Sequence, residues 1–499
     1  MYVEAPVEHP QRLNAFLARE HRLLVGGEWI VPATDEGIEV VDPATARSIA
    51  TVPDASGPDV DRAVASARKA LEGPWARMLP VERQDLMLRL ADLVAAHEDE
   101  IAHLEALEQG KLLEFARAIE VDMAVDYLRY MAGWATKIRG ETFEISPRMP
   151  EGIRFHAYTR REPIGVVGGI VPWNFPHLMA VWKIAPALAT GCTVVLKPAE
   201  ETPLSALFLG ELVTETGFPP GVVNVITGRG ETTGAALVAH HGLDKITFTG
   251  STEVGKEIAR VAAGNLTRVA LELGGKSPVI VLDDIGADMV SGGMVGGLFF
   301  NTGQQCVAGS RLYAPRDRFD EVVGRIADIA DFLKIGSPFD PNVHIGPVVS
   351  RTQQERVLSY IEEAGKLGAD VVVGGAAPEA PGFFVEPTVI ANVDQKARVV
   401  QEEIFGPVLV AMPYDDLEGL VAMANDTVYG LAASIWGKNV SRILELVPRI
   451  KAGTVWVNSH SVLDANMPFG GMKMSGIGRE HGTAAIDEYT EPKTVCIAY

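Results

Sequence analysis

Cysteine is scarce in this chain of 499 residues, which has only Cys192, Cys306 and Cys496. An odd and small number in a long chain does not form a disulfide framework. The sequence also lacks a Cys-x-x-Cys motif, and the adjacent His240 and His241 cannot share one helical face. We therefore expect neither a disulfide framework nor a bound metal.

Long apolar runs are missing as well. No stretch approaches the roughly 20 apolar residues that span a bilayer. Residues 1–20 are polar and lack the apolar centre of a signal peptide. These absences favour a cytoplasmic protein that does not act on membranes.

Basic residues are outnumbered, with 44 Lys and Arg against 65 Asp and Glu, so the formal charge is -21. Such a field repels a phosphate backbone, and nucleic acid is not an expected partner. Local backbone donors can still hold a dinucleotide. The hydrophobic share of 47% is sufficient for large cores, and the length predicts two large domains with smaller attachments.

The flanking segments predict helices and an extended arm. Up to about residue 138 the pattern indicates short strands followed by helices over 60–70 and 80–107, without residues that indicate chemistry. Residues 139–162 predict a projecting hairpin, because glycines and prolines separate β-prone residues. The tail, residues 488–499, predicts a strand whose partner would be a neighbouring subunit.

Two α/β runs fill the rest of the chain. In the first, strands are predicted at 164–171, 193–196, 222–226, 245–248 and 269–271, and helices at 177–190, 203–216, 232–240 and 251–262. This alternation is typical of a parallel sheet that binds dinucleotides. In the second, strands are predicted at 279–282, 371–373, 408–412 and 454–458, and helices at 319–333, 352–367 and 440–447.

Two segments carry candidate reactive groups. Cys306 lies among glycine and glutamine residues that leave a thiol accessible, although most lone cysteines are inert and buried. Glu272 directly follows an apolar strand and precedes Gly274 and Gly275, where a half-apolar niche would raise its pKa and make it a base near neutral pH. A structural carboxylate bonded to turn amides is the alternative for Glu272.

Polar residues also follow the strands of the first α/β run. Asn174 follows the first strand, beside Trp173, and offers a side-chain N–H to an oxyanion or serves only as a turn residue. Lys197 and Glu200 follow the next strand and can reach ribose hydroxyls, unless they form a surface ion pair. A carboxylate there would repel a 2′-phosphate, which favours NAD over NADP.

The phosphate-binding signal is weaker. Ser251 is a good N-cap for a helix that could receive a pyrophosphate. Gly230 and Gly234 lie in an earlier turn, but their spacing is not the G-x-G-x-x-G fingerprint. Glu403 and Phe405 could anchor a nicotinamide ribose, or belong to a solvated acidic turn.

Together and in this order, these segments resemble the aldehyde dehydrogenase superfamily over nearly the whole chain. The two signature regions of that family correspond to Leu271-Glu-Leu-Gly-Gly-Lys276 and Gly303-Gln-Gln-Cys306. The other matching motifs are Pro172-Trp-Asn-Phe-Pro176, Phe248-Thr-Gly-Ser251, Glu402-Glu-Ile-Phe-Gly-Pro407 and Pro468-Phe-Gly-Gly-Met-Lys473-Met-Ser-Gly476.

The resemblance implies an α/β fold with three parts. A Rossmann-like NAD-binding domain would span residues 1–138 and 163–273, and a second α/β catalytic domain would span 274–478. The hairpin and the tail, 139–162 and 479–499, would form a β-arm for oligomerisation. Dimers or tetramers of the same chain are expected.

The resemblance also implies a mechanism. Cys306 would attack a small aldehyde, the Asn174 amide and the Cys306 N–H would hold the oxyanion, and hydride would pass to NAD. Glu272 would then activate the water that hydrolyses the thioester. Because a free thiol is only a few per cent ionised at pH 7, activation by Glu272 or by the bound nicotinamide is expected. Lys183 matches a lysine near the catalytic centre of the family. The cofactor set is Trp173, Lys197, Glu200, Gly230, Gly234, Ser251, Glu403 and Phe405.

The substrate is expected to be hydrophobic. Residues 458–473 are similar to phenylacetaldehyde dehydrogenases, and Glu272 favours the branch that hydrolyses the thioester over the one that makes acyl-CoA. By family position the tunnel would be lined by Phe175, Met179, Trp182, Phe300, Leu463 and Phe469. Gln305 departs from the pattern, because many relatives have an apolar or small residue beside the nucleophile. A thiol esterase on the same site and a non-catalytic nucleotide-binding scaffold are the alternative functions.

Overall fold

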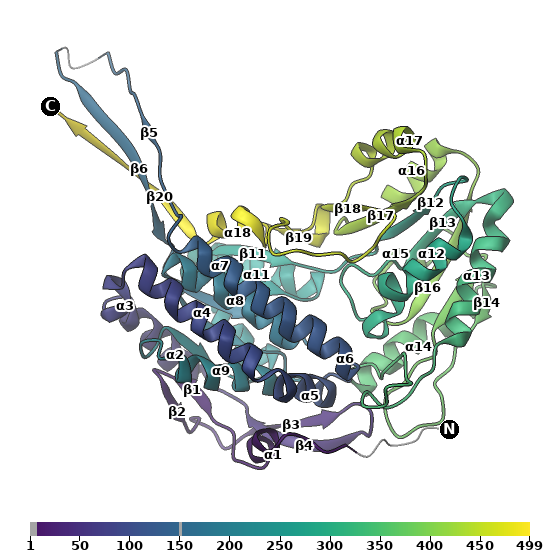
Figure 1. The fold of residues 1–499 in the computed structure, drawn as a ribbon, viewed down its shortest axis with the longest axis horizontal. Helices are drawn as coiled ribbons and strands as arrows, with labels where there is room; N and C mark the ends of the chain where they lie inside the picture. Colours follow the sequence, from purple (N-terminus) through teal and green to yellow (C-terminus); the bar gives the residue numbers. More distant parts are fainter. Residues whose placement is uncertain (1–6, 149–151) are drawn as a thin grey trace.

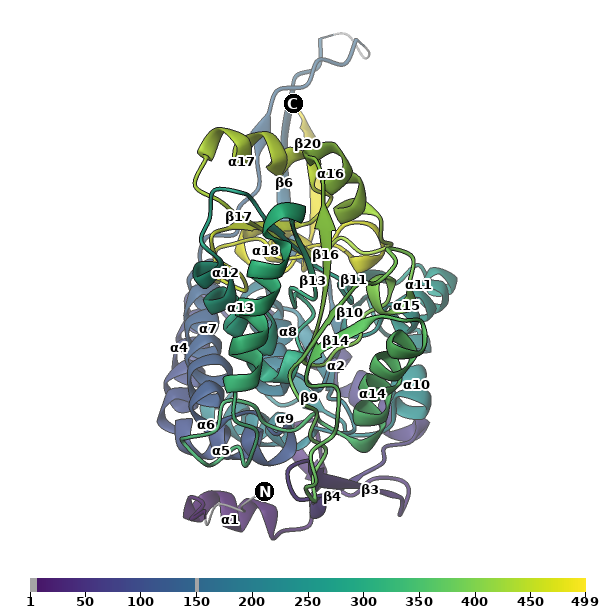
Figure 2. The ribbon, with the colours of Figure 1, turned by 90° about the vertical axis from the view of Figure 1, so that its right-hand side faces the viewer.

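Two mostly parallel sheets, each in its own lobe, form the body of the chain (Figure 1). The computed structural model describes residues 7–148 and 152–499, so residues 149–151 of the predicted hairpin lie outside the described residues. A slender arm projects from the first lobe in both views (Figures 1 and 2). The α/β fold class predicted from the sequence is confirmed.

The first sheet has the strand order β19-β11-β10-β7-β8-β9-β1-β2. Its strands are β1 Leu23–Val25, β2 Glu28–Ile30, β7 Val166–Ile170, β8 Thr193–Lys197, β9 Val223–Val225, β10 Lys245–Thr249, β11 Arg268–Glu272 and β19 Gly476–Ile477. From β11 to β9 neighbouring strands are parallel. The strand order reverses between β7 and β10, so the loops after these strands open a crevice of the kind that binds dinucleotides.

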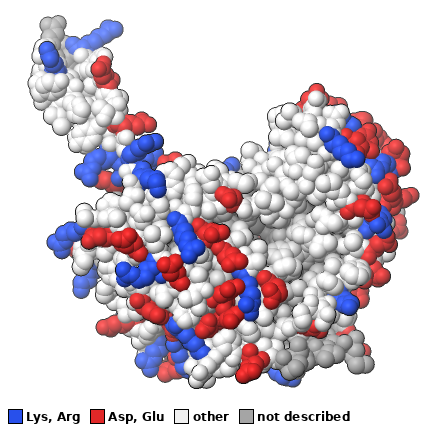
Figure 3. All heavy atoms as spheres, in the orientation of Figure 1, with Lys and Arg blue, Asp and Glu red and all other residues white. Residues whose placement is uncertain are grey.

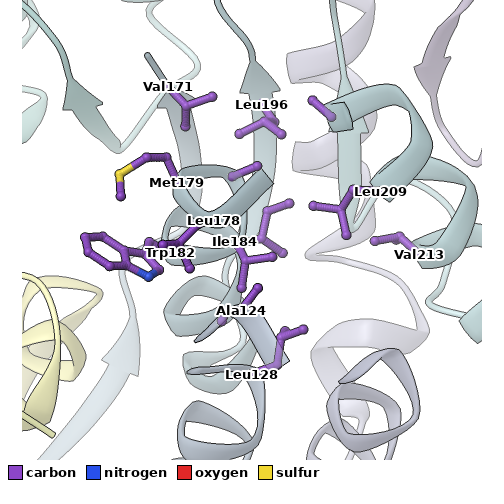
Figure 4. Packing of buried hydrophobic residues seen from close by; sticks show 14 of the residues in the cluster. Ala124, Leu128, Val171, Leu178, Met179, Trp182, Ile184, Leu196, Leu209 and Val213 are labelled. Carbon is purple, nitrogen blue, oxygen red and sulfur yellow. The ribbon is translucent and has the colours of Figure 1, made fainter. Parts of the chain in front are cut away.

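Helices cover both faces of this sheet. They are α1 Gln11–Leu17, α2 Gly57–Ala70, α3 Pro74–Arg77, α4 Pro80–Ala96, α5 Glu98–Glu108, α6 Leu113–Phe115, the π-helical η1 Ala116–Asp122, α7 Met123–Trp134, α8 Pro176–Thr190, α9 Leu204–Thr216, the π-helical η2 Gly230–Gly234, α10 Ala235–Ala239, α11 Thr252–Asn265 and α18 Gly482–Glu488. Every residue of α8 is buried, and Figure 4 shows its Ile184 between Leu196 of β8 and Leu128 of α7. The core therefore fixes α8, whose N-terminus borders the site.

The second sheet has the order β14-β15-β16-β13-β12-β17-β18. Its strands are β12 Pro278–Val281, β13 Arg311–Pro315, β14 Asp370–Val373, β15 Thr388–Ala391, β16 Val408–Tyr414, β17 Ala432–Trp436 and β18 Thr454–Val457. The helical segments around it are α12 Ala287–Met294, η3 Val295–Phe299, η4 Phe300–Gly303, η5 Arg316–Arg318, α13 Phe319–Phe332, α14 Arg351–Lys366, α15 Arg398–Gln401, α16 Leu417–Asn425, α17 Val440–Leu446, η6 Val447–Arg449 and η7 Lys473–Ser475. Strand β19 returns from this part of the chain to pair with β11 of the first sheet.

The arm is an antiparallel sheet of β5 Thr142–Phe143, β6 Phe155–Pro163 and β20 Thr490–Ala498. The tail strand β20 pairs with β6 of its own chain over its whole length, from Thr490 opposite Pro163 to Ala498 opposite Phe155. We expected the tail strand to pair with a neighbouring subunit. This expectation is wrong for the edge of β20 that pairs with β6. A separate hairpin, β3 Gly37–Asp42 with β4 Arg47–Pro53, lies below the first lobe.

Some predicted elements differ from the structure. The single helix expected over 80–107 is two helices, α4 and α5, because His97 adopts a non-helical backbone conformation that ends one and begins the other. Strands β13, β15 and β17 were not predicted, since strands buried on both faces show no polar alternation. No helix in the described residues is long and apolar enough to cross a membrane.

Candidate active site

A cavity of about 330 Å³ lies where the two lobes meet. Figure 3 shows the hollow between them, bordered in this view mainly by uncharged residues. The cavity brings Cys306 and Glu272 together with all of the predicted tunnel residues, namely Phe175, Met179, Trp182, Phe300, Gln305, Leu463 and Phe469. Residues more than a hundred positions apart in the chain therefore share one mainly apolar wall that contains several aromatic rings.

Cys306 lies in a tightly turned loop after η4. Gly303 has a φ of 73°, and a Cβ there would lie 2.1 Å from the Gly406 carbonyl oxygen, so only glycine fits. Gln304 holds the loop from the other side, since its side-chain oxygen accepts the Val349 N–H at 2.9 Å. The thiol is therefore placed by a rigid turn and remains partly exposed to the cavity.

The surroundings of Cys306 favour the protonated thiol over the thiolate. Burial, followed by the negative charges of Glu403 and Glu272, raises its pKa to about 12. The backbone N–H groups of Cys306 and Val307 act against this shift by hydrogen bonding to the sulfur. A reaction through the thiolate therefore requires a proton acceptor close by.

Glu272 ends β11 with its carboxyl group in the same cavity. Burial, and then the charge of Glu480, raises its pKa well above the ordinary value of 4.5. Its Oε2 atom has no hydrogen-bond partner in the described part of the chain, which disagrees with the alternative of a carboxylate bonded to turn amides. The side chain lies against Gly470, where a Cβ would be 2.6 Å from Oε1.

Lys183 and Glu480 form a buried ion pair beside the cavity. Lys183 Nζ also donates to Thr249 Oγ1 at 2.7 Å, and both Thr249 and Glu480 line the cavity. The structure thus places the predicted Lys183 next to the reactive groups. Glu480 was missed, because it follows the last motif by four residues and has no sequence signal of its own.

Asn174 follows β7 and meets the cysteine loop directly. Its side-chain Nδ2 donates to the Gln304 carbonyl at 2.9 Å, and its own carbonyl accepts from Asn301 Nδ2 at 3.0 Å. The amide is therefore held two residues from Cys306. This placement is compatible with a donor to an oxyanion formed at that sulfur.

The polar amide of Gln305 is turned into hydrogen bonds with the protein. Its Nε2 donates to the Phe300 carbonyl at 3.0 Å, and its Oε1 accepts from Ser461 Oγ at 3.4 Å. Since both ends of the amide are engaged, this residue leaves the wall largely apolar.

The predicted adenosine residues lie together after β8. Lys197 Nζ is 3.4 Å from Glu200 Oε2, and the Gly230 N–H lies 3.4 Å from Glu200 Oε1. A Cβ on Gly234 would lie 3.7 Å from Lys197. Lys197 is buried and Glu200 is half-exposed, so the pair differs from an ordinary surface ion pair.

The predicted phosphate and nicotinamide residues lie at the crevice between the lobes. Ser251 caps α11 by accepting the Val254 N–H at 3.3 Å, and a helix N-terminus favours a phosphate. Trp173 and Phe405 meet edge to face at 5.1 Å. Glu403 accepts the Gly275 N–H at 2.9 Å, and burial raises its pKa to about 7, so it is not part of a solvated turn. This donor set and the crevice after β7 and β10 fit a dinucleotide.

Other parts of the wall were missed. Phe115, Ile119 and Met123 line the cavity from α6, η1 and α7, within the segment that was predicted to carry no chemistry. Helical spacing of apolar residues does not distinguish a cavity wall from an ordinary core. His460 also lines the cavity, and its Nε2 lies 2.8 Å from the Val307 carbonyl in the cysteine loop.

The fold and the site define a two-lobed α/β protein in which a thiol and a buried carboxylate line one cavity beside a crevice of the dinucleotide-binding kind. The sequence profile described as "Aldehyde dehydrogenase family" matches residues 29–495. The chain belongs to this family and is an aldehyde dehydrogenase. A nicotinamide dinucleotide is the cofactor of the family, as the sequence motifs predicted.

Named relatives agree with this assignment. The chain is 51% identical over 482 residues to a phenylacetaldehyde dehydrogenase of Pseudomonas fluorescens, covering 96% of each chain. A solved NAD+ complex of an aldehyde dehydrogenase from Bacillus cereus is 45% identical, with a TM-score of 0.96 and 99% of each chain covered. A betaine aldehyde dehydrogenase from Staphylococcus aureus, also solved with NAD+, is 37% identical with a TM-score of 0.93, covering 97% of this chain and 96% of that one.

Proposed function

We propose that this chain oxidises a hydrophobic aldehyde, with an arylalkyl aldehyde such as phenylacetaldehyde preferred, to the carboxylic acid with NAD. The observation that carries the proposal is the cavity of about 330 Å³, which Cys306 and Glu272 line together with apolar residues that include Phe175, Phe300 and Phe469. The likeness to a phenylacetaldehyde dehydrogenase supports the substrate class. An apolar wall favours a phenyl or alkyl group because burying that surface removes it from water.

Cys306 is the proposed nucleophile. Glu272 accepts the thiol proton within the cavity, and the sulfur attacks the aldehyde carbon to form a thiohemiacetal. The backbone N–H of Cys306, which bonds to the sulfur, and the side-chain amide of Asn174, which is held at Gln304 in the same loop, donate to the oxyanion. When bound, the nicotinamide supplies the hydride acceptor that converts the thiohemiacetal to a thioester.

Glu272 is also the proposed base of the hydrolytic step. Burial raises the pKa of Glu272 and so makes its carboxylate form a stronger base; this carboxylate takes a proton from water, and the hydroxide formed attacks the thioester. The acid leaves and the Cys306 thiol is regenerated. Glu480, paired with Lys183 on the same wall, offers a further acceptor for the proton that Glu272 must release.

The adenosine end favours NAD over NADP. Glu200 is held by the buried Lys197 and by the Gly230 N–H, so its carboxylate stays at the end of β8. There it can accept hydrogen bonds from both ribose hydroxyls, whereas a 2′-phosphate would meet a negative charge.

The arm supports a homo-oligomer, either a dimer or a tetramer. In the described part of the chain β20 is hydrogen bonded along one edge only, to β6. Its other edge carries unpaired backbone groups on a projecting element, and a strand from a second copy could pair with them.

An aldehyde series measured by NADH formation tests the proposal. We expect phenylacetaldehyde to give a higher kcat/KM than benzaldehyde, short straight-chain aldehydes or betaine aldehyde. Cys306→Ala should abolish NADH formation and keep NAD binding, while the matched control Cys496→Ala, on the exposed arm, should stay fully active. Preference for betaine aldehyde would overturn the aromatic substrate class.

The alternatives give different outcomes in the same assays. A thiol esterase would cleave an aryl ester without oxidising any aldehyde, and a nucleotide-binding scaffold would bind NAD and do neither. Normal NADH formation by Cys306→Ala would overturn the covalent mechanism.

A further inference from the structure

A buried ion pair lies behind the oxyanion amide, and no motif pointed to it. Lys111 follows α5 and pairs with Glu120 of η1, and both side chains are fully buried. The two residues belong to the N-terminal segment that showed no sign of chemistry in the sequence. Burying two charges is costly unless further hydrogen bonds satisfy them, so the additional partners of this pair are informative.

Lys111 uses its remaining donors on the turn that carries Asn174. Its Nζ donates to the Asn174 backbone carbonyl at 3.0 Å and lies 4.3 Å from the centre of the Phe175 ring. The same carbonyl accepts from Asn301 Nδ2 at 3.0 Å. Both lone pairs of this oxygen are thus occupied, one by the N-terminal helical layer and one by the cysteine loop.

The carboxylate of the pair holds the next residues of the same turn. Helix α8 begins after Phe175, which has no side-chain acceptor to cap it, so its first N–H groups need partners from elsewhere. Glu120 Oε2 accepts the Leu178 N–H at 2.8 Å, and Glu105 Oε1 accepts the His177 N–H at 3.1 Å. The backbone is therefore clamped on both sides of Phe175.

From these contacts we infer that Lys111 is a positioning residue for the oxyanion amide of Asn174, acting through the Asn174 carbonyl with Glu120 as its anchor. This inference rests on the proposed role of Asn174. A donor acts on a developing charge only when its geometry is preorganised, and a shift of about 1 Å can lower a rate by about a hundredfold. Lys111 touches neither the cavity nor the cofactor crevice in the described residues, so its effect must pass through Asn174 and Phe175.

The test is a double-mutant cycle on kcat. K111M/E120Q removes both charges together, so neither is left buried and unpaired, and glutamine still offers an acceptor to the Leu178 N–H. We expect kcat for phenylacetaldehyde to fall about tenfold, with KM for NAD unchanged. In an Asn174→Ala background the same pair of substitutions should lower kcat by less than about twofold, because the amide to be positioned is absent.

A control uses another ion pair of this lobe, in which Lys245 is buried and Glu488 is partly exposed. Lys245 and Glu488 meet at 2.9 Å outside the cavity, and K245M/E488Q should leave kcat unchanged. If K111M/E120Q does not fold, K111Q/E120Q removes the same charges and keeps amides that can hydrogen bond to one another.

Two results would overturn the inference. The first is an unchanged kcat in K111M/E120Q. The second is an equal loss of kcat with and without the Asn174 amide, because an equal loss would indicate a general structural role for the ion pair. If Asn174→Ala alone has a normal kcat, the proposed oxyanion role of Asn174 fails instead, so the two failures are distinguishable.

Discussion

Replacing Glu272 by glutamine separates the two chemical steps of the proposed mechanism. Glutamine has the same shape and fits against Gly470, but it cannot accept a proton from water. The carboxyl group of Glu272 is buried and its pKa is raised, so a neutral amide at this position should not destabilise the fold. The variant therefore tests chemistry rather than folding.

The expected result is an NADH burst of about one equivalent per active site, followed by slow turnover. General-base catalysis contributes about 10²–10⁴ to a rate, and we expect a loss in this range in the steady state, equivalent to about 3–5 kcal/mol in the barrier. Glu272 Oε2 has no hydrogen-bond partner in the described part of the chain, so no residue bonded to this oxygen is in place to take over the proton transfer.

Stopped-flow absorbance of NADH with phenylacetaldehyde measures both phases. Glu211→Gln, at a surface ion pair with Arg19, is the matched control and should keep both. A normal steady-state rate in Glu272→Gln would refute the role of this residue in hydrolysis. Loss of the burst itself would show that Glu272 acts chiefly by activating the Cys306 thiol.

Two further predictions follow from the crevice and from the buried carboxylates. Glu200→Gln should raise kcat/KM for NADP about tenfold and lower it for NAD, because one negative charge near the 2′-phosphate is removed. An unchanged ratio of the two kcat/KM values would contradict the placement of the adenosine ribose beside Glu200. Burial raises the pKa of Glu108 from 4.5 to about 7, so between these values the folded protein holds a proton that the unfolded chain has lost, and stability falls as pH rises. Glu108→Gln should make this fall smaller in urea unfolding at about pH 5 and about pH 8, and an identical fall would refute the assignment.

Much of the first lobe could be predicted because its signals are local. Apolar strands alternate with helices between residues 164 and 271, and each predicted strand is present in the first sheet. The second lobe was harder, since β13 contains Arg311 and β17 contains small residues, so neither stands out from a helix or loop. Their strand character comes from neighbours on both sides in the sheet.

The candidate site divides in the same way. Cys306, Glu272 and Asn174 occur in motifs with a recognisable order. The structure places Cys306 and Glu272 in one cavity and bonds the Asn174 amide to the cysteine loop. Lys111, whose partners are Glu120 and the Asn174 carbonyl, has no such motif. Its contacts join positions that are nine and sixty-three residues apart, and nothing in local spacing indicates them.

The sequence by itself determined the class of fold, the family and the chemical groups available, because these depend on periodicity and on residue types in order. Only the tertiary structure decided how those groups are tuned. Burial raised the pKa of Cys306 and of Glu272. The turn of the cysteine loop placed the thiol at the cavity, and the Gln305 amide formed hydrogen bonds with the protein. Desolvation and hydrogen-bond partners are properties of the packed interior, and residues distant in the chain create them.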